Sequence, residues 1–476
     1  MKSTIMEDFP KQHEPRLEQE KALREFEIKY PHYDVFVINA PTATGKTDMD
    51  VTIARHIHKK YNHKSTIITP TKVLVKQLID EFPRMATLKS KADYNCKSAT
   101  TEIGPKGGET VKPCGACAVC KQRLKDNRRI RVMPYSVVNY WIYYSYKLYN
   151  NTLIADESHN ILELLKDIGA KKFWQSQEGF PEDVETYGDV LGWAEAEMEY
   201  RPTKKLKTLI SELKTHQPST TLQVTYEKRY GTPEHCMKLL PLDARHMPPT
   251  MWPHNKVKKI VLLSATIGPQ DIYDLGLDGR RVCYINCDSP IPPKNRPVLY
   301  TPIGDMSRAH QKESIPLIAK EISRLEGVED GKGLIHCTYA VARELRTLLK
   351  GRRYLFHTKQ NKDRQYETFL KSDNGIFIAS GMHEGIDLVG SSGRWQVITQ
   401  VPYPSLADPA VSTRLETDPD WYAWSSIKAL LQASGRICRT PTDYGKTIIL
   451  DNQFKRLYTK NKDMFPQWYK DAVRGI

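Results

Sequence analysis

One short stretch, residues 33–47, constrains the fold of this chain more than any other. It reads YDVFVINAPTATGKT. The apolar run Val35–Ile38 predicts a buried strand, and residues 48–60 predict a helix. A strand, a loop that ends in Gly-Lys-Thr and a helix form the order typical of a phosphate-binding loop. In such a loop, backbone N–H groups and the helix N-terminus surround anionic phosphates.

The side chains of this loop predict a bound nucleotide and a metal ion. Lys46 can reach the β- and γ-phosphates, and the Thr47 hydroxyl can bind Mg²⁺. Ala40 stands where the usual pattern has glycine, which removes some backbone freedom. The alternative is a chance Gly-Lys-Thr on a surface loop, but the flanking strand and helix favour the nucleotide site. We therefore expect ATP and Mg²⁺ as cofactors, with nucleotide contacts from Ala40, Thr42, Thr44, Gly45, Lys46 and Thr47.

A pair of acids follows a second predicted strand, residues 152–155. Downstream of a phosphate loop, such a pair predicts that Asp156 holds Mg²⁺ through water. Glu157 would orient and activate the attacking water. His159 would couple the nucleotide site to the neighbouring domain. The alternative is the ordinary enrichment of acids at a helix N-terminus.

Four cysteines have the spacing of metal ligands: Cys96, Cys114, Cys117 and Cys120. Four thiolates suit a [4Fe–4S] cluster. Zinc is the second choice, because its usual signature is two separate Cys-x-x-Cys knuckles. The flanking segments are basic, which favours a surface for a phosphate backbone. We expect the other cysteines to be buried apolar residues: Cys236, Cys283, Cys287, Cys337 and Cys438.

The charge balance favours nucleic acid as a partner. The chain has 476 residues, enough for two or three domains, and a formal net charge of +15. No apolar run approaches the length of a membrane span. The first fifteen residues lack the apolar core of a signal peptide, so we expect a cytoplasmic protein without a membrane partner.

The second half predicts another parallel α/β sheet, after a linker at residues 290–293. One of its strands is predicted at residues 397–402. Gln432 lies near two arginines, Arg436 and Arg439, which would share one face of a helix. Arginine suits a transferring phosphoryl group, so we expect Arg439 to act as an arginine finger with Arg436 beside it on the γ-phosphate.

This order of motifs resembles superfamily 2 helicases of the iron–sulfur group that includes XPD and DinG. Ser158 stands where that family usually has alanine. The resemblance implies an adenine-side motif at Arg16 and Gln19, and a link between nucleotide and DNA at Asp387 with Glu384. It also implies that residues 264–266 connect hydrolysis to domain movement, and that Gln432 belongs to the last motif.

The predicted fold class is α/β, with two RecA-like parallel-sheet motor domains, an inserted Fe–S module and a short insertion like the family's Arch. The first motor domain would comprise residues 1–85, 132–167 and 238–290. The four-cysteine module would occupy residues 86–131, the short insertion 168–237 and the second motor domain 291–476.

The predicted function is an ATP-dependent DNA helicase that translocates on single-stranded DNA and unwinds tailed or forked duplexes. The family resemblance implies 5′→3′ movement. The chain is compact for this family, so we expect a bacterial or phage-infected host cytoplasm as the location. We expect a monomer. Three alternatives stay open: a DNA-stimulated ATPase that remodels complexes without unwinding, a metal-bearing binding protein with an inactive motor, and an RNA or hybrid substrate.

Overall fold

The computed structural model describes most of the chain, and the fold is described for those residues only. They are residues 4–83, 85–87, 101–103, 109–111, 130–134, 151–180, 184, 186–216, 220–229, 232–245, 247, 252, 257–382, 386 and 388–476. The four predicted cluster ligands Cys96, Cys114, Cys117 and Cys120 lie outside this set, as do Glu384 and Asp387.

The first lobe is built on a seven-stranded parallel sheet in the order β12-β1-β11-β7-β2-β6-β3. Apolar residues on both faces bury this sheet between two layers of helices. Its strands are β1 (Val35–Asn39), β2 (Lys64–Thr69), β3 (Ala86–Thr87), β6 (Ile130–Pro134), β7 (Asn151–Ala155), β11 (Lys259–Ser264) and β12 (Val282–Asn286). Its helices are η1 (Ile5–Asp8), α1 (Leu17–Lys29), α2 (Lys46–Tyr61), α3 (Lys72–Glu81), η4 (Ser158–Asn160), α6 (Ile161–Gly169) and α10 (Pro269–Asp274).

The second lobe repeats this plan with a parallel sheet in the order β15-β16-β14-β17-β18-β13-β19. Its strands are β13 (Val298–Gly304), β14 (Gly333–Cys337), β15 (Tyr354–Phe356), β16 (Ile376–Ser380), β17 (Trp395–Ile398), β18 (Lys446–Asp451) and β19 (Val473–Arg474). Its helices are η6 (Pro293–Asn295), α11 (Gln311–Val328), α12 (Tyr339–Leu348), α13 (Lys362–Lys371), η7 (Gly390–Ser392), α14 (Pro409–Thr417), α15 (Pro419–Ser434), α16 (Gln453–Lys460), η8 (Lys462–Met464) and α17 (Gln467–Lys470).

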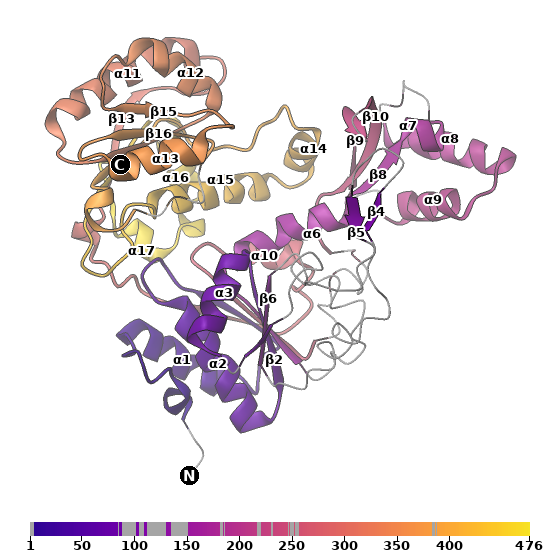
Figure 1. Cartoon of the computed structure of the whole chain (residues 1–476), viewed down its shortest axis with the longest axis horizontal. Coiled ribbons are helices and arrows are strands. Elements are labelled where there is room, and N and C mark those ends of the chain that lie inside the picture. The colour runs from indigo at the N-terminus through magenta and orange to yellow at the C-terminus, as the bar shows by residue number, and fades with distance from the viewer. Residues whose placement is uncertain are drawn as a thin grey trace.

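An inserted unit, residues 171–241, projects from the first lobe and contacts the second lobe where β9 meets α14 (Figure 1). It consists of β8 (Lys171–Trp174), α7 (Gln175–Glu178), α8 (Tyr187–Tyr200), α9 (Lys204–His216), β9 (Thr220–Arg229) and β10 (Thr232–Pro241). The three strands form their own antiparallel sheet, β8-β10-β9, which shares an apolar core with the helices. A separate pair, β4 (Thr101–Ile103) and β5 (Glu109–Val111), is also antiparallel.

Two sequence expectations need correction. The strand expected at 397–402 is β17, which runs from Trp395 to Ile398. Arg436 and Arg439 do not share a helix face, because α15 ends at Ser434 and both arginines lie in the turn and loop that follow. Gly435 caps the C-terminus of α15, so both arginines lie on irregular backbone beyond the helix.

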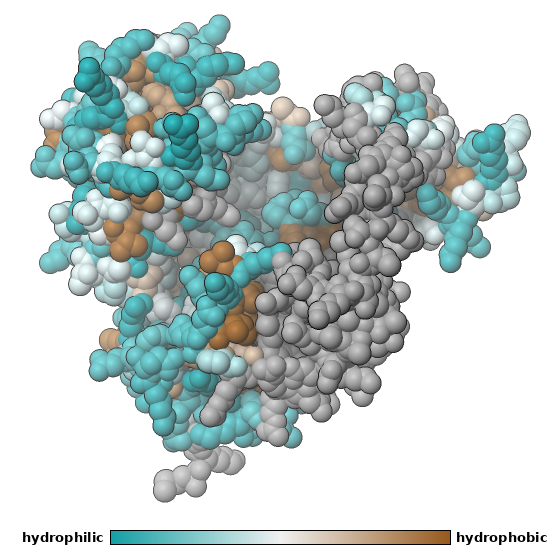
Figure 2. All heavy atoms as spheres, in the orientation of Figure 1, coloured by the Kyte–Doolittle hydropathy of each residue, from teal (hydrophilic) through white to brown (hydrophobic). Residues whose placement is uncertain are grey.

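The five cysteines expected to be buried are buried, and each is a free thiol. The small sheet of the inserted unit continues to Pro241, beyond residue 237, where the insertion was expected to end. Figure 2 shows hydrophilic residues over most of the visible face of the second lobe and at the outer end of α8 and α9. None of the helices in the described ranges has the length and apolar character needed to span a bilayer.

Leu213 tests whether the inserted unit depends on its own core. This side chain is fully buried in the α8–α9 cluster, so Leu213→Ala should destabilise the unit by about 2–5 kcal/mol. Limited proteolysis should then cut within residues 171–241 before it cuts the lobes. Ile210→Ala, at a half-buried position of the same helix, is the control and should change the cleavage rate much less. Equal rates for both variants would contradict a cooperative core.

Candidate nucleotide site between the lobes

The loop between β1 and α2 is shaped by two residues with left-handed backbone. Ala43 has φ 70° and Gly45 has φ 86°. The conformation of Gly45 favours glycine, and a Cβ there would lie only 2.4 Å from Gln19 Nε2. This close approach lets the Gln19 amide donate a hydrogen bond of 2.8 Å to the Gly45 carbonyl. The loop therefore needs glycine for both its turn and its contact with α1.

Several residues predicted to contact the nucleotide instead make hydrogen bonds that fix the conformation of the loop. The Arg16 guanidinium donates to the Ala43 carbonyl, and its backbone N–H donates to Gln19 Oε1 at 2.8 Å. The buried Thr44 hydroxyl donates to the Pro41 carbonyl at 2.7 Å. Ala40 is buried as well, and its N–H donates to the Ser264 carbonyl at 2.9 Å. Thr44 and Ala40 thus shape the loop, while Thr47 lies in the first turn of α2.

The acidic pair lies directly against Lys46. Asp156 follows the end of β7, and its carboxylate accepts a 2.9 Å hydrogen bond from the Glu157 N–H. Glu157 has φ 45°, an uncommon left-handed conformation for a residue other than glycine. Its Oε1 lies 3.0 Å from Lys46 Nζ. The predicted phosphate-binding lysine and the predicted water-activating acid therefore form an ion pair in this structure.

The charges of this cluster shift one another. Burial and the neighbouring Glu157 raise the pKa of Asp156 to about 6. Burial also disfavours the charged forms of Lys46 and Glu157, but their mutual attraction outweighs it. This attraction raises the pKa of Lys46 and lowers the pKa of Glu157. Both groups of the ion pair are therefore charged near neutral pH.

His159 joins the acidic pair to the end of β11. Its Nδ1 lies 2.8 Å from Ser264 Oγ and 3.5 Å from Glu157 Oε2. Ser264 Oγ in turn accepts a 3.1 Å hydrogen bond from the Thr266 N–H. The link expected from His159 to a neighbouring domain runs in this structure to residues 264–266 of the same lobe.

The second lobe meets the phosphate loop at the end of α15. A Cβ on Gly435 would lie 3.2 Å from Thr42 Oγ1, and Ala43 packs against the apolar cluster that contains Ile437 and Cys438. The Arg439 guanidinium is close enough to lower the pKa of Lys46 and of Glu157, although burial and their own attraction act more strongly. Arg439 therefore lies within electrostatic range of the Lys46–Glu157 pair.

The other residues of the last predicted motif lie nearby. The Arg436 guanidinium donates to the Ile386 carbonyl at 3.3 Å, and the Arg439 N–H donates to Asp443 Oδ2 at 2.9 Å. Gln432 is in the final turn of α15. The structure thus brings one lysine, two acids and the Arg439 region together from distant parts of the sequence.

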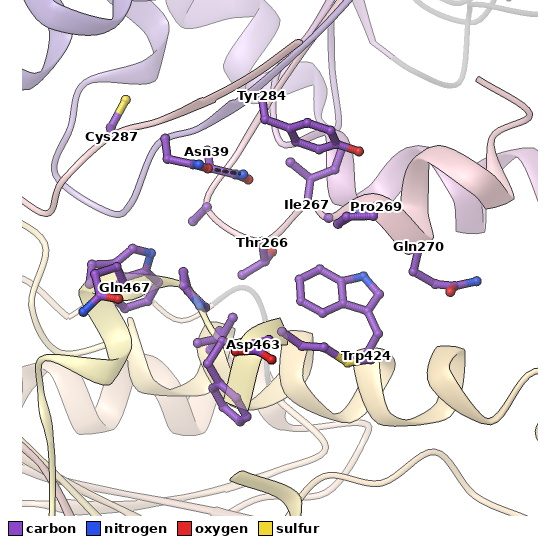
Figure 3. A pocket seen from close by; sticks show the side chains of 18 of the residues that line it. Asn39, Thr266, Ile267, Pro269, Gln270, Tyr284, Cys287, Trp424, Asp463 and Gln467 are labelled. Atoms are coloured by element: carbon purple, nitrogen blue, oxygen red, sulfur yellow. Dashed lines mark hydrogen bonds between the residues drawn. The ribbon is translucent and has the colours of Figure 1, made fainter. Parts of the chain in front are cut away.

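A cavity of about 570 Å³ opens between the lobes (Figure 3). First-lobe residues at the ends of β1, β11 and β12 line one side, and α15 with residues 463–468 lines the other. Lys46, Asp156 and Glu157 do not line it. The lining includes Ile267 from the core on the α10 face of the sheet and Cys287 from the core on the α2 face.

Asp50 was missed by the sequence analysis. It lies on α2 beyond Lys46, its side chain is fully buried, and neither carboxylate oxygen has a hydrogen-bond partner in the described part of the chain. Burial, together with the nearby Asp156, raises the pKa of Asp50 well above its usual range. An acid within an otherwise apolar stretch of a helix was the available signal in the sequence.

Two family models match successive parts of the chain. The model described as "Type III restriction enzyme, res subunit" matches residues 12–178, and the "Helicase C-terminal domain" model matches residues 334–472. The first contains the phosphate loop and the acidic pair. The second contains the arginines of the last motif.

Individual relatives match shorter segments. A "Regulator of telomere elongation helicase 1 homolog" of Drosophila sechellia is 30% identical over 106 residues, which are 19% of this chain and 11% of that protein. The Bos taurus "Regulator of telomere elongation helicase 1" is 28% identical over 123 residues, which are 22% and 10% of the two chains. This chain thus matches about a tenth of the length of these curated relatives.

Solved structures match the whole fold. The S. tokodaii Xpd4 structure superposes with a TM-score of 0.61 at 14% identity, over 97% of this chain and 100% of that one. A structure titled "XPD_Helicase" gives a TM-score of 0.62 at 14% identity, over 96% and 98%. The predicted α/β class with two RecA-like lobes is confirmed. The motifs, the two family models and this fold are thus similar to those of superfamily 2 helicases of the XPD and DinG type.

Proposed function

We propose that this protein is an ATP-dependent DNA helicase that moves along single-stranded DNA and unwinds duplexes with single-stranded tails. The observation that carries the proposal is the 3.0 Å contact between Lys46 and Glu157, with Arg439 of the second lobe in electrostatic reach of both. A site assembled from two lobes changes its contacts when a nucleotide binds or is hydrolysed. The net charge of +15 is consistent with a DNA backbone as the track.

The residues fit ATP and Mg²⁺. Lys46 would leave Glu157 for the β- and γ-phosphates, while Thr47 and Asp156 would hold the metal, directly and through water. Mg²⁺ would neutralise charge on the phosphates. The freed Glu157 carboxylate would then orient a water for attack, and the arginines of the second lobe would stabilise the charge that develops.

A polar network between α10 and the second lobe supports coupling of the two lobes. The buried Arg414 side chain donates to Asp274 and to the Leu242 carbonyl, the latter at 2.7 Å. Asp271 accepts hydrogen bonds from Trp424 Nε1 at 2.7 Å and Lys428 Nζ at 2.6 Å. Since α10 follows residues 264–266, changes at the acidic pair can reach α15 through this network.

Lys46→Ala tests the nucleotide site. Loss of the Lys46 ammonium, which lies 3.0 Å from Glu157, should lower ATP hydrolysis by about 10²-fold or more, because the phosphates lose a fixed positive charge. Binding to fluorescent single-stranded DNA should be almost unchanged. Lys59→Ala, at an exposed position of the same helix, is the control and should hydrolyse ATP at the wild-type rate. Normal turnover by Lys46→Ala would reject the assignment.

Arg414→Met tests the network between the lobes. The substitution leaves Asp274 buried without its cation, which should cost about 3–5 kcal/mol of stability at this interface. Stimulation of ATP hydrolysis by single-stranded DNA should fall more than basal hydrolysis. The control Arg324→Met removes an exposed ion pair with Glu321 on α11 and should cost less than about 1 kcal/mol. Equal loss of basal and stimulated rates would argue against coupling through Arg414.

We further propose that Cys96, Cys114, Cys117 and Cys120 bind a [4Fe–4S] cluster, with zinc as the second candidate, and that the chain has the four domains expected from the sequence, with the short insertion at residues 171–241. The support is the spacing of the cysteines and the family resemblance. Cys117→Ser should remove the brown colour and most of the bound iron, and should weaken unwinding more than ATP hydrolysis. Purified wild-type protein that contains zinc and no iron would exclude the cluster.

Unwinding and direction are tested by strand displacement. The family resemblance supports 5′→3′ movement, so a duplex with a 5′ tail should be unwound and one with a 3′ tail should not. The principal alternative is a DNA-stimulated ATPase that moves on DNA and remodels complexes without unwinding. That enzyme would hydrolyse ATP with either substrate but displace neither strand. Matching RNA and hybrid substrates would define the preferred nucleic acid.

A further inference from the structure

Asp50 is unusual among the buried aspartates of the described residues. Asp8 lies against His56, Asp274 against Arg414, and Asp451 accepts backbone N–H groups. Asp156, Asp271 and Asp443 also accept hydrogen bonds. Asp50 is fully buried, and neither of its carboxylate oxygens has a hydrogen-bond partner among the residues that the structure describes. Burial of an uncompensated carboxylate is unfavourable, so the position calls for a compensating group.

The position of Asp50 indicates what that group is. Asp50 is four residues after Lys46 on α2, and side chains at this spacing share one helix face. The charged groups that act on Asp50 are Asp156, Lys46 and Glu157. Lys46 is already paired with Glu157 at 3.0 Å. Asp50 and Asp156 therefore share one nearby lysine with Glu157, and both acids lose its attraction when Lys46 moves to a phosphate.

A hydrated divalent cation would supply the positive charge that compensates these acids. In the described part of the chain, only His13, Asp48 and Glu81 bring ligand atoms within 4.8 Å of one another. Asp50, Asp156 and Glu157 are therefore too far apart to enclose a bare ion. Mg²⁺ keeps several waters in proteins, and those waters can bridge carboxylates at such separations.

We propose that Asp50 binds, through water, the Mg²⁺ that accompanies the nucleotide, from the face of α2 that also carries Lys46. This inference rests on the proposed function, because the cation enters with ATP. Asp50 acts as a positioning residue: it holds a metal-bound water and does not touch the reacting atoms. Thr47 and Asp156 remain the residues next to the ion, and Asp50 fixes the hydration shell behind it.

The test measures metal affinity without catalysis. A fluorescent ADP analogue is bound to wild-type protein and to Asp50→Asn while Mg²⁺ is titrated. Asparagine keeps the shape of the side chain but removes its charge. The Mg²⁺ concentration at half-maximal nucleotide binding should rise about 10- to 100-fold in Asp50→Asn. Nucleotide binding in the presence of a metal chelator should stay at the wild-type level.

Asp48→Asn is the matched control, because it removes the same charge two residues earlier on the same helix. Asp48 Oδ1 lies 2.8 Å from His13 Nδ1, so this carboxylate has its partner away from the phosphate loop. Its Mg²⁺ requirement should equal that of the wild type. Thermal unfolding gives a second readout: Mg²⁺ with ADP should stabilise wild type more than Asp50→Asn or Asp50→Leu.

The outcomes separate this inference from the proposed function. The role of Asp50 would be overturned if Asp50→Asn had an unchanged Mg²⁺ requirement and were stabilised by Mg²⁺ and ADP as much as the wild type. Asp50 would then be a neutral buried acid with no role in metal binding. A wild-type protein that binds no Mg²⁺–nucleotide at all would overturn both. A raised Mg²⁺ requirement in Asp50→Asn but not in Asp48→Asn supports Asp50, even if strand displacement is absent.

Discussion

The ion pair between Lys46 and Glu157 is the contact on which the arrangement of this protein depends. It joins the first turn of α2 to the end of β7, and it forms where burial disfavours both charges. A buried pair persists only if its surroundings supply compensating charges or hydrogen bonds. Here they come from Asp156, His159 and the Arg439 region of the second lobe. In the proposed function, this cluster would transmit a change at the phosphates to the contact between the lobes.

Two kinds of contact hold the lobes together. Near the phosphate loop the contact is close and mostly apolar, with Gly435 against Thr42 and Ala43 in the Ile437 cluster. Along α10 it is polar, through Arg414 and Asp271. Apolar contacts tolerate small sliding, whereas buried ion pairs have discrete partners. If the chain acts as the proposed motor, this difference favours movement at the phosphate end of the interface while the α10 end retains its partners.

Much of the nucleotide site could be predicted because its residues follow local patterns. Lys46 ends a glycine loop after a strand, and Asp156 and Glu157 end another strand, so parallel strands bring them to one edge. The roles of Arg16 and Gln19 were harder to predict, since their contacts with Ala43 and Gly45 depend on the path of the loop. The helix face expected for Arg436 and Arg439 was wrong, because spacing alone does not reveal that α15 ends at Ser434.

The sequence by itself determined the α/β class, the phosphate loop, the acidic pair and the arginine-bearing motif, because periodicity and short-range spacing encode strands, helices and their ends. The tertiary structure alone decided which charges meet. It paired Lys46 with Glu157, buried Arg414 against Asp274, and left Asp50 without a partner beside the acids. The strength of such interactions depends on burial and on the distance between residues that are far apart in the chain. Neither quantity can be predicted from local sequence.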